Sequence, residues 1–356
     1  MMGRFLFATD AWEPQVNGVV RTLSHLMAEL VRSGHATDVL SPKDFRTFPC
    51  PTYPDIRLSL ATTAAAEQRI DRFEPTNVHI ATEGPIGSAM RRACLKRGLP
   101  FTTSFHTRFP EYLRARAPVP ERWSYAWLRR FHGAGDACLV PTETMREQLE
   151  ARGFRNLVTW TRGVDHSVFR PRRTLPLDLP RPIYLTVSRL APEKNIEAFL
   201  DLDLEGSKLV VGEGPIMADL MRRYPHAHFA GLQTGEALAR YYASADVFVF
   251  PSKTDTFGIV LLEAIACGTP FASYSEPGPI DVLGSSRAGI ASGDLGEACR
   301  RALTLSRTDA VARARDFTWQ RCADIFLDAT AGSGSGRAGE RARLRRFDPH
   351  AEALSA

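Results

Sequence analysis

The sequence predicts an α/β fold made of two doubly wound, Rossmann-like domains facing a cleft. Three observations indicate this fold. The chain has 356 residues, more than one hydrophobic core usually serves. Short apolar runs alternate with amphipathic helical patterns, which is typical of parallel sheets. A proline-rich stretch without apolar periodicity, residues 171–182, separates two series of these units.

The first series begins at the N-terminus. An apolar run opens residues 4–12, and residues 18–35 then carry apolar side chains at the i, i+3, i+4, i+7 spacing of a one-sided helix, with Gly34 as its C-cap. Residues 36–42 form the next strand. The alternation continues with strands expected at 77–84, 101–107 and 137–142 and helices expected at 85–99, 121–134 and 143–153.

The second series follows the proline-rich boundary. Strands are expected at 183–190, 208–215, 227–231, 247–252 and 270–274, and helices at 236–245 and 258–267. We therefore expect an N-terminal domain over 1–170 and a C-terminal domain over 171–316. Residues 331–356 are Gly/Ser-rich and then arginine-rich, which predicts a flexible basic tail. The alternative is a tail that touches an anionic membrane.

The composition indicates an ordinary globular protein, with 44% hydrophobic and 24% charged residues. No run approaches the ~18 apolar residues of a membrane helix. The N-terminal apolar run is shorter than the ~7 residues of a signal peptide core, which predicts a cytoplasmic location. Reduced structural thiols are expected because the six cysteines are scattered without metal-ligand spacing: Cys50, Cys94, Cys138, Cys267, Cys299 and Cys322.

Positive charge is concentrated in one part of the chain. The formal net charge is +5, but residues 90–173 contain 17 Lys or Arg against 7 Asp or Glu. This excess favours an anionic partner, which could be a phosphate, nucleic acid or acidic lipid, and a merely solvated basic face is the alternative. In the same region Trp123 and Trp127 lie four residues apart on the expected helix. They predict either a helix that docks on lipid or, our preferred interpretation, a helix that faces the core.

Two carboxylates stand out in residues 251–270. Asp255 lies in a turn after a buried strand, and Glu263 interrupts an apolar helix. A buried charge needs a partner, and the two hydroxyls of a sugar diol could supply one for Glu263. The amides of Phe257–Val260 point out of the helix N-terminus, where an anion or a sugar hydroxyl can bind. For Asp255 the alternative is a capping role at that terminus.

Other candidate residues follow strands or precede helices. Arg189 and Lys194 follow a strand and could neutralise a departing diphosphate. Gly212 and Gly214 flank Glu213 after the next strand, but this is a weak dinucleotide fingerprint and a tight turn is the alternative. Further candidates are Asn17 and Gly18, which precede a helix, and His106, which ends a strand.

Taken together, these segments resemble family 4 of the retaining glycosyltransferases, which have the two-domain GT-B fold. "SRLAPEKN", "VGEGP", "PSKTDTFGIVLLEAIACG" and "RGVDHSVFRP" look like motifs of that family. "EPQVNGVVRTL" and "SFHTRFPEYL" resemble its lipid-directed mannosyl and glycosyl transferase branch. The resemblance covers about residues 4–327. It implies that a C-terminal helix near 317–328 returns to the first domain.

The resemblance also implies roles for the candidates. Arg189 and Lys194 would bind the donor diphosphate, Glu263 the nucleotide ribose, and Asp255 the transferred sugar. His106 would lie near the reacting carbon. Other donor-binding residues would be Asn17, Gly18, Gly212, Glu213, Gly214, Thr256, Phe257, Gly258, Ile259 and Val260. Two departures are Asp255, where the family usually has glutamate, and Arg162, where many members have asparagine.

The implied activity is retaining transfer of a hexose, with mannose from GDP-mannose as first choice, to a lipid or glycan hydroxyl. Arg189 and Lys194 would stabilise the leaving diphosphate, and a phosphate oxygen would accept the acceptor's proton on the same face. We expect no metal, no other cofactor and no nucleic-acid partner, but a peripheral contact with an anionic membrane. The alternatives are a UDP-hexose donor, a GT-B nucleotide-sugar epimerase and a non-catalytic nucleotide-sugar binding protein.

Overall fold

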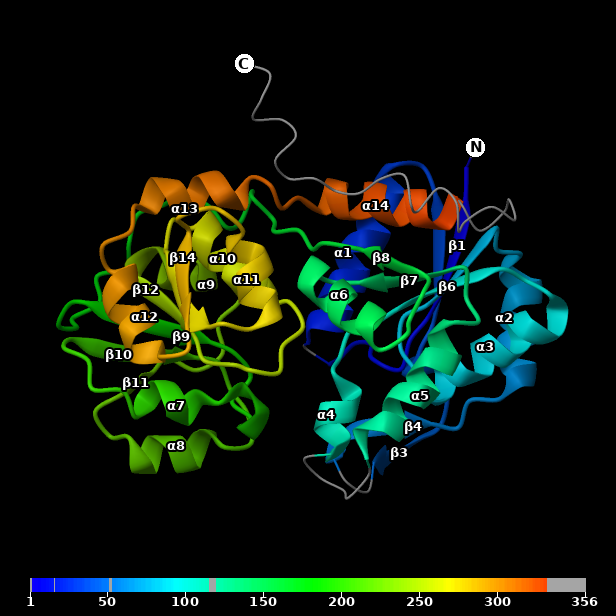
Figure 1. Cartoon of the computed structure of the whole chain (residues 1–356), viewed down its shortest axis with the longest axis horizontal. Helices are drawn as coiled ribbons and strands as arrows, with labels where there is room; N and C mark the ends of the chain where they lie inside the picture. Colours follow the sequence, from blue (N-terminus) through cyan, green and yellow to red (C-terminus); the bar gives the residue numbers. More distant parts are fainter. Residues whose placement is uncertain (1, 16, 51–52, 115–119, 332–356) are drawn as a thin grey trace, which may run out of the picture. The chain divides into compact units, whose positions relative to one another are not determined.

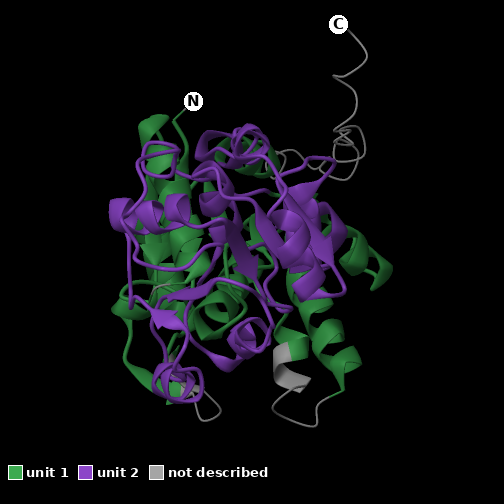
Figure 2. Ribbon diagram, turned by 90° about the vertical axis from the view of Figure 1, so that its left-hand side faces the viewer, with its two compact units in different colours: residues 1–140, 146–160, 323–356 green, residues 141–145, 161–322 purple. Residues whose placement is uncertain are grey.

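The computed structural model describes residues 2–15, 17–50, 53–114 and 120–331, and the expected tail at 331–356 lies almost wholly outside this range. The chain divides into two compact units (Figure 2). Unit 1 comprises residues 1–140, 146–160 and 323–356, and unit 2 comprises residues 141–145 and 161–322. Each unit contains one six-stranded parallel sheet.

The sheet of unit 1 has the strand order β2-β1-β5-β6-β7-β8. Chain order reverses direction between β1 and β5, which makes their carboxyl ends the topological switch point where ligands bind in such folds. The strands are β1 (Arg4–Ala8), β2 (Ala36–Leu40), β5 (Asn77–Ile80), β6 (Phe101–Ser104), β7 (Ala137–Val140) and β8 (Leu157–Thr159). An antiparallel pair, β3 (Thr47–Cys50) and β4 (Tyr53–Ser59), is separate from this sheet.

Helices cover the sheet of unit 1 because its strands are apolar on both faces (Figure 1). Leu6 and Ala8 of β1 belong to a core cluster that includes residues of α2 and α3. The helices of this part of the chain are α1 (Gly18–Arg32), α2 (Thr63–Phe73), α3 (Pro85–Arg97), α4 (Phe109–Arg114), α5 (Glu121–His132) and α6 (Glu143–Ala151), with a 3-10 turn, η1, at Pro42–Asp44.

The C-terminal helix α14 (Trp319–Ala331) packs its apolar face on unit 1. Phe326 is fully buried, and its ring lies 5.6 Å from the ring of Phe7 and 5.8 Å from that of Trp160. The carbonyl of Thr330 accepts a hydrogen bond from the Asn77 side chain. These contacts join a segment near residue 326 to the sheet formed by the first 160 residues.

The sheet of unit 2 has the strand order β11-β10-β9-β12-β13-β14, so its switch point lies between β9 and β12. Alternate residues of β9 enter different core clusters, Leu185 one and Tyr184 the other, which shows that both faces are buried. The strands are β9 (Ile183–Val187), β10 (Ser207–Val211), β11 (His228–Phe229), β12 (Val247–Phe250), β13 (Phe271–Tyr274) and β14 (Gly289–Ser292).

The helices of unit 2 are divided between the two faces. Residues of α9, α10, α11 and α13 join the cluster of Leu185, and residues of α7, α8 and α12 join that of Tyr184. Their bounds are α7 (Ile196–Leu200), α8 (Met217–Arg223), α9 (Gly235–Ser244), α10 (Ile259–Ala266), α11 (Pro277–Leu283), α12 (Leu295–Ala302) and α13 (Arg307–Ala314), with a 3-10 turn, η2, at Pro192–Lys194.

Candidate active site

Lys194 and Asp255 meet at the switch point of unit 2. Lys194 ends η2, which follows β9, and Asp255 lies in the loop after β12. The Lys194 Nζ lies 2.5 Å from the Asp255 Oδ1, and each side chain is 23% exposed. The Asn195 side chain donates a hydrogen bond to the Pro251 carbonyl and thereby ties the two loops together. The structure therefore brings together two of the predicted catalytic residues. Arg189, also predicted, follows β9 by two residues and is exposed.

Glu263 lies on α10 but is nearly fully buried, with 1% of its surface exposed. The Tyr242 hydroxyl of α9 donates a hydrogen bond of 2.9 Å to the Glu263 Oε2. A buried tyrosine therefore already supplies one hydrogen-bond donor to this carboxylate. Whether Glu263 also contacts a nucleotide ribose stays a prediction.

The N-terminus of α10 has no side-chain cap among the described residues. Its N-cap residue is Gly258, which has φ +88°. The alternative that Asp255 caps this helix is therefore wrong. Thr256, Ile259 and Val260 are half-buried, whereas the Phe257 side chain belongs to the core, so Phe257 can offer a ligand only its backbone.

Gly212 and Gly214 are required by close packing. Gly212 has φ +136°, and a Cβ there would lie 1.9 Å from the Ser188 carbonyl oxygen. A Cβ on Gly214 would lie 2.2 Å from the Leu190 carbonyl oxygen. The intervening Glu213 is exposed, and its Oε1 accepts a hydrogen bond of 3.5 Å from the Leu232 amide. The glycines thus let the loop after β10 pack closely on the loop after β9, and donor binding by them stays a prediction.

Asn17 and Gly18 begin α1 after β1 of unit 1. The Asn17 Oδ1 accepts hydrogen bonds of 3.0 Å from the amides of Val19 and Val20, so Asn17 is the N-cap of this helix. A Cβ on Gly18 would meet nothing within 4 Å. The space beside Gly18 would allow a phosphate to approach, but two of the first-turn amides are already used by the cap.

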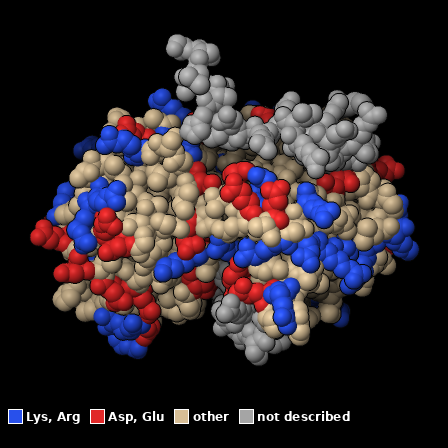
Figure 3. Space-filling model, in the orientation of Figure 1, with Lys and Arg blue, Asp and Glu red and all other residues tan. Residues whose placement is uncertain are grey.

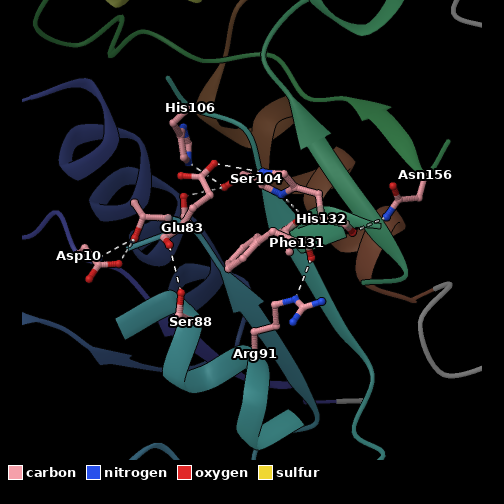
Figure 4. Close-up of polar contacts among 12 residues, drawn as sticks. Asp10, Glu83, Ser88, Arg91, Ser104, His106, Phe131, His132 and Asn156 are labelled. Atoms are coloured by element: carbon pink, nitrogen blue, oxygen red, sulfur yellow. Dashed lines mark hydrogen bonds and ion pairs between the residues drawn. The ribbon is translucent and has the colours of Figure 1, made fainter. Parts of the chain in front are cut away.

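His106 follows β6 and is held by a chain of hydrogen bonds that reaches into the sheet, and Figure 4 shows His106 beside Ser104, the first member of this chain. Its Nε2 lies 2.8 Å from the Ser104 Oγ, and that oxygen lies 3.1 Å from the Nε2 of His79. His79 is buried, and its Nδ1 lies 2.9 Å from the Thr102 Oγ1. These contacts restrict the orientation of the His106 ring at the carboxyl edge of the sheet.

A second buried histidine, which was not predicted from the sequence, lies on the other side of β6. His132 ends α5, is fully buried, and places its Nδ1 2.9 Å from the Thr103 Oγ1. Its Nε2 lies 3.1 Å from the Glu83 Oε1 (Figure 4). Burial lowers the pKa of His132, contacts with Cys138 and Glu83 raise it, and the net result is a pKa of about 10. The signal available in the sequence was an acidic residue just after the strand at 77–80.

Asp10 also lies at the switch point of unit 1, but its carboxylate is occupied by structural hydrogen bonds. Its carboxylate accepts hydrogen bonds from the amide of Ile86 at 2.8 Å and from the Thr82 hydroxyl at 2.8 Å. Burial raises the pKa of Asp10, and these hydrogen bonds oppose that effect. Asp10 therefore fixes the start of α3 just beyond Glu83.

The basic region at 90–173 forms an exposed surface on α3 and α5 of unit 1. Lys and Arg gather where these helices lie in Figure 3, and Arg122, Arg129 and Arg130 of α5 are exposed. Trp123 is 63% exposed and Trp127 45%. The expectation of a helix that faces the core is confirmed, because Tyr125 and Leu128 fill the inner face of α5, but both tryptophans lie on its exposed face.

Arg162 and the described cysteines lie in the interior. Arg162 is 3% exposed, and burial lowers its pKa to about 10. Five cysteines are buried free thiols, as expected: Cys94, Cys138, Cys267, Cys299 and Cys322. The Cys50 side chain lies outside the described residues. Within the described ranges no group of three or more His, Cys, Asp or Glu side chains could hold a metal ion. None of the described helices combines the length and apolarity needed to span a bilayer.

The two six-stranded parallel sheets, each with polar groups at the carboxyl ends of its strands, give the chain the GT-B fold. Solved structures of this fold match nearly the whole chain. They include the sucrose-phosphate synthase of Thermosynechococcus elongatus, at TM-score 0.73 and 18% identity over 94% of this chain and 100% of that one. Another is Anabaena HepE in complex with UDP and glucose, at TM-score 0.67 and 14% identity over 92% of this chain and 99% of that one.

The chain belongs to glycosyltransferase family 4. The model of Glycosyltransferase Family 4 matches residues 16–168, and that of Glycosyl transferases group 1 matches residues 181–307. A GDP-mannose-dependent alpha-mannosyltransferase of Mycobacterium tuberculosis is 31% identical over 81% of this chain and 83% of its own length. The sulfoquinovosyl transferase SQD2 of Arabidopsis thaliana is 31% identical over 68% and 51%. The alpha-monoglucosyldiacylglycerol synthase of Streptococcus pneumoniae is 26% identical over 76% and 70%. The protein is thus a retaining hexosyltransferase that uses a nucleotide sugar.

Proposed function

We propose that this enzyme transfers mannose from GDP-mannose to a hydroxyl group of a lipid acceptor with retention of configuration. The observation that carries the proposal is the Lys194–Asp255 pair at the switch point of unit 2. An ammonium group there can stabilise the leaving diphosphate, with Arg189 as the second cation. The adjacent carboxylate can accept hydrogen bonds from the hydroxyls of the transferred sugar. The choice of donor rests on relatives named as GDP-mannose-dependent.

In this mechanism the bond between the sugar C1 and the diphosphate breaks first. The departing oxygen gains negative charge as it leaves, which is when the two cations stabilise it most. A phosphate oxygen then accepts the proton of the acceptor hydroxyl, whose oxygen bonds to C1 on the face that the diphosphate left. His106 of unit 1 is the proposed contact for the sugar near the reacting carbon.

The donor can be tested by thermal melting of the full chain with GDP, UDP, GDP-mannose and UDP-glucose. A ligand that binds the folded state raises the melting temperature by mass action, and we expect the GDP compounds to give the larger shift. A larger shift with UDP-glucose would replace the proposed donor with a UDP-hexose.

Catalysis by the ion pair can be tested by replacing Lys194 with alanine. We expect Lys194→Ala to lower the transfer rate at least about 100-fold, because leaving-group stabilisation of this kind contributes several kcal/mol. Lys253→Ala, in the loop after β12, is the matched control and should keep the rate. Lys253 is exposed and packs on Tyr274. Near-normal transfer by Lys194→Ala would contradict the proposed role.

The exposed tryptophans of α5 support a lipid rather than a soluble glycan as acceptor. Trp123 and Trp127 stand beside Arg122, Arg129 and Arg130, a combination that suits the boundary between anionic headgroups and acyl chains. We expect Trp123→Ala and Trp127→Ala together to reduce binding to vesicles containing phosphatidylglycerol. Met221→Ala removes an exposed apolar side chain of unit 2 and should not. If the double tryptophan variant binds these vesicles as well as Met221→Ala does, a soluble glycan becomes the better candidate acceptor.

A further inference from the structure

Glu83 lies at the switch point of unit 1, and no backbone amide of the described residues donates a hydrogen bond to its side chain. It follows β5 by three residues, whereas Asp10, after β1, is held by the start of α3. The Glu83 side chain is 18% exposed. Its Oε1 is held by His132, and its Oε2 has no partner among the described residues. This carboxylate therefore keeps hydrogen-bonding capacity at the place where doubly wound sheets bind ligands.

The support behind Glu83 is built into the core of the sheet. His132 is fully buried, and both of its ring nitrogens are engaged, Nδ1 with Thr103 and Nε2 with Glu83. Whether the Thr103 hydroxyl donates to a neutral ring or accepts from a charged one, Nε2–H donates to the carboxylate. His132 thus holds Glu83 in one orientation. Burying a polar ring such as that of His132 costs free energy, and an apolar residue at this position would avoid that cost.

Glu83 and His106 lie at the same edge of the sheet. β5 and β6 are neighbours, with Ile80 paired to Thr103, so the loops that follow them emerge side by side. The Ser104 hydroxyl, which contacts His106, also donates a 3.4 Å hydrogen bond to the Ala81 carbonyl in the loop of Glu83. Figure 4 shows the carboxylate of Glu83 and the ring of His106 at this edge.

We propose that Glu83 binds a hydroxyl group of the acceptor substrate and that His132 is the positioning residue that orients it. This inference rests on the proposed transferase function and assigns part of its acceptor site to unit 1. A carboxylate accepts hydrogen bonds from hydroxyl groups and can bind both hydroxyls of a vicinal diol. It repels a phosphate, which argues against the donor diphosphate as its ligand. The acceptor is therefore a neutral polyhydroxylated group at the point of contact.

The test compares acceptor and donor kinetics of Glu83→Gln and Glu83→Ala in the full chain. Transfer from GDP-mannose is measured to octyl glucoside, monoacylglycerol and phosphatidylinositol in mixed micelles, and slow hydrolysis of the donor is measured without acceptor. We expect the acceptor KM to rise about 10- to 100-fold, the range for loss of a hydrogen bond to a charged group. The KM for the donor in hydrolysis should stay within about twofold.

A matched carboxylate controls for effects on the fold. Glu29 of α1 has a side chain 21% exposed and pairs with Arg32, so Glu29→Gln removes a charge of similar exposure away from the strand ends. It should leave the acceptor KM unchanged. In Glu83→Gln the new side chain has nearly the same volume as glutamate and can still accept a hydrogen bond from His132. The test therefore remains valid if Glu83→Ala fails to fold.

His132 is tested by a rescue pair. His132→Gln can keep an N–H near Glu83 and should retain most of the acceptor affinity, whereas His132→Leu removes the donor and should raise the acceptor KM as Glu83→Gln does. Equal acceptor KM values for these two variants would overturn the positioning role.

Failure of the inference can be distinguished from failure of the proposed function. A wild-type enzyme that transfers sugar, together with a Glu83→Gln variant of unchanged acceptor KM, overturns the inference alone. A rise in the donor KM without a rise in the acceptor KM also overturns it, because Glu83 would then contact the transferred sugar. If the wild type transfers sugar to none of the three probes, the proposed function and the inference fall together.

Discussion

Removal of the Tyr242 hydroxyl should destabilise unit 2, because Tyr242 holds the buried carboxylate of Glu263. The hydroxyl is fully buried and donates at 2.9 Å to a carboxylate that is 1% exposed, so water cannot readily replace it. A hydrogen bond to a charged group contributes about 1.5–3 kcal/mol. For a domain of the size of unit 2, each kcal/mol shifts the melting temperature by about 2–4 °C, so Tyr242→Phe should melt about 3–12 °C lower.

The assay is thermal melting of the full chain, followed by circular dichroism, with and without GDP-mannose. Tyr241→Phe is the control, because this neighbouring hydroxyl of α9 donates no hydrogen bond to another described residue. Glu263→Gln can still accept from Tyr242 and should lose less stability. If Glu263 contacts the nucleotide ribose, this variant should nevertheless bind the donor about tenfold more weakly. A Tyr242→Phe variant that melts within 1 °C of wild type would refute the structural reasoning, and wild-type donor affinity in Glu263→Gln would refute the ribose contact.

Three further variants probe the glycines and the buried histidine. Gly212→Ala should lower the free energy of unfolding by at least about 2 kcal/mol in urea titrations, because the new Cβ would meet the Ser188 carbonyl at a positive φ. Gly18→Ala should change that free energy by less than about 0.5 kcal/mol, yet lower donor affinity in titration calorimetry if a phosphate approaches there. For His132 the folded pKa of about 10 exceeds the ordinary 6.5, so its stabilisation is complete below pH 6.5 and is lost as the pH rises toward 10. His132→Gln should flatten that part of the stability profile, and an unchanged profile would contradict the pKa.

The alternation of strands and helices could be predicted because parallel strands covered on both faces are continuous apolar runs. The segments 183–187 and 247–250 show this pattern, and both are buried strands. Elements without such a signal were missed. Helix α2 has only two buried residues, Ala66 and Ile70, and α11 contains two prolines and a glycine. Local pattern is weak where tertiary packing decides the conformation.

Only those residues of the candidate site that directly follow strands could be predicted from the sequence. Lys194 and Asp255 were identified in this way, but nothing local to either residue indicates that they pair across 61 positions. The partner of Glu263 lies on another helix, and His132 lies 49 residues from Glu83. Such partners are properties of the folded sheet. No local pattern around Glu263 indicates that Tyr242 donates a hydrogen bond to it.

A common arrangement supports the polar residues of both units. Glu263 is held by Tyr242, Glu83 by His132, and His106 by Ser104 and the buried His79. Each supporting side chain is at most 1% exposed, so no solvent competes for its hydrogen bond. A buried polar group that loses its partner is costly, which makes alternative orientations of these side chains unfavourable. Glu263, Glu83 and His106 are therefore oriented before any substrate binds. Because these side chains are already ordered, the entropic cost of binding donor and acceptor is smaller.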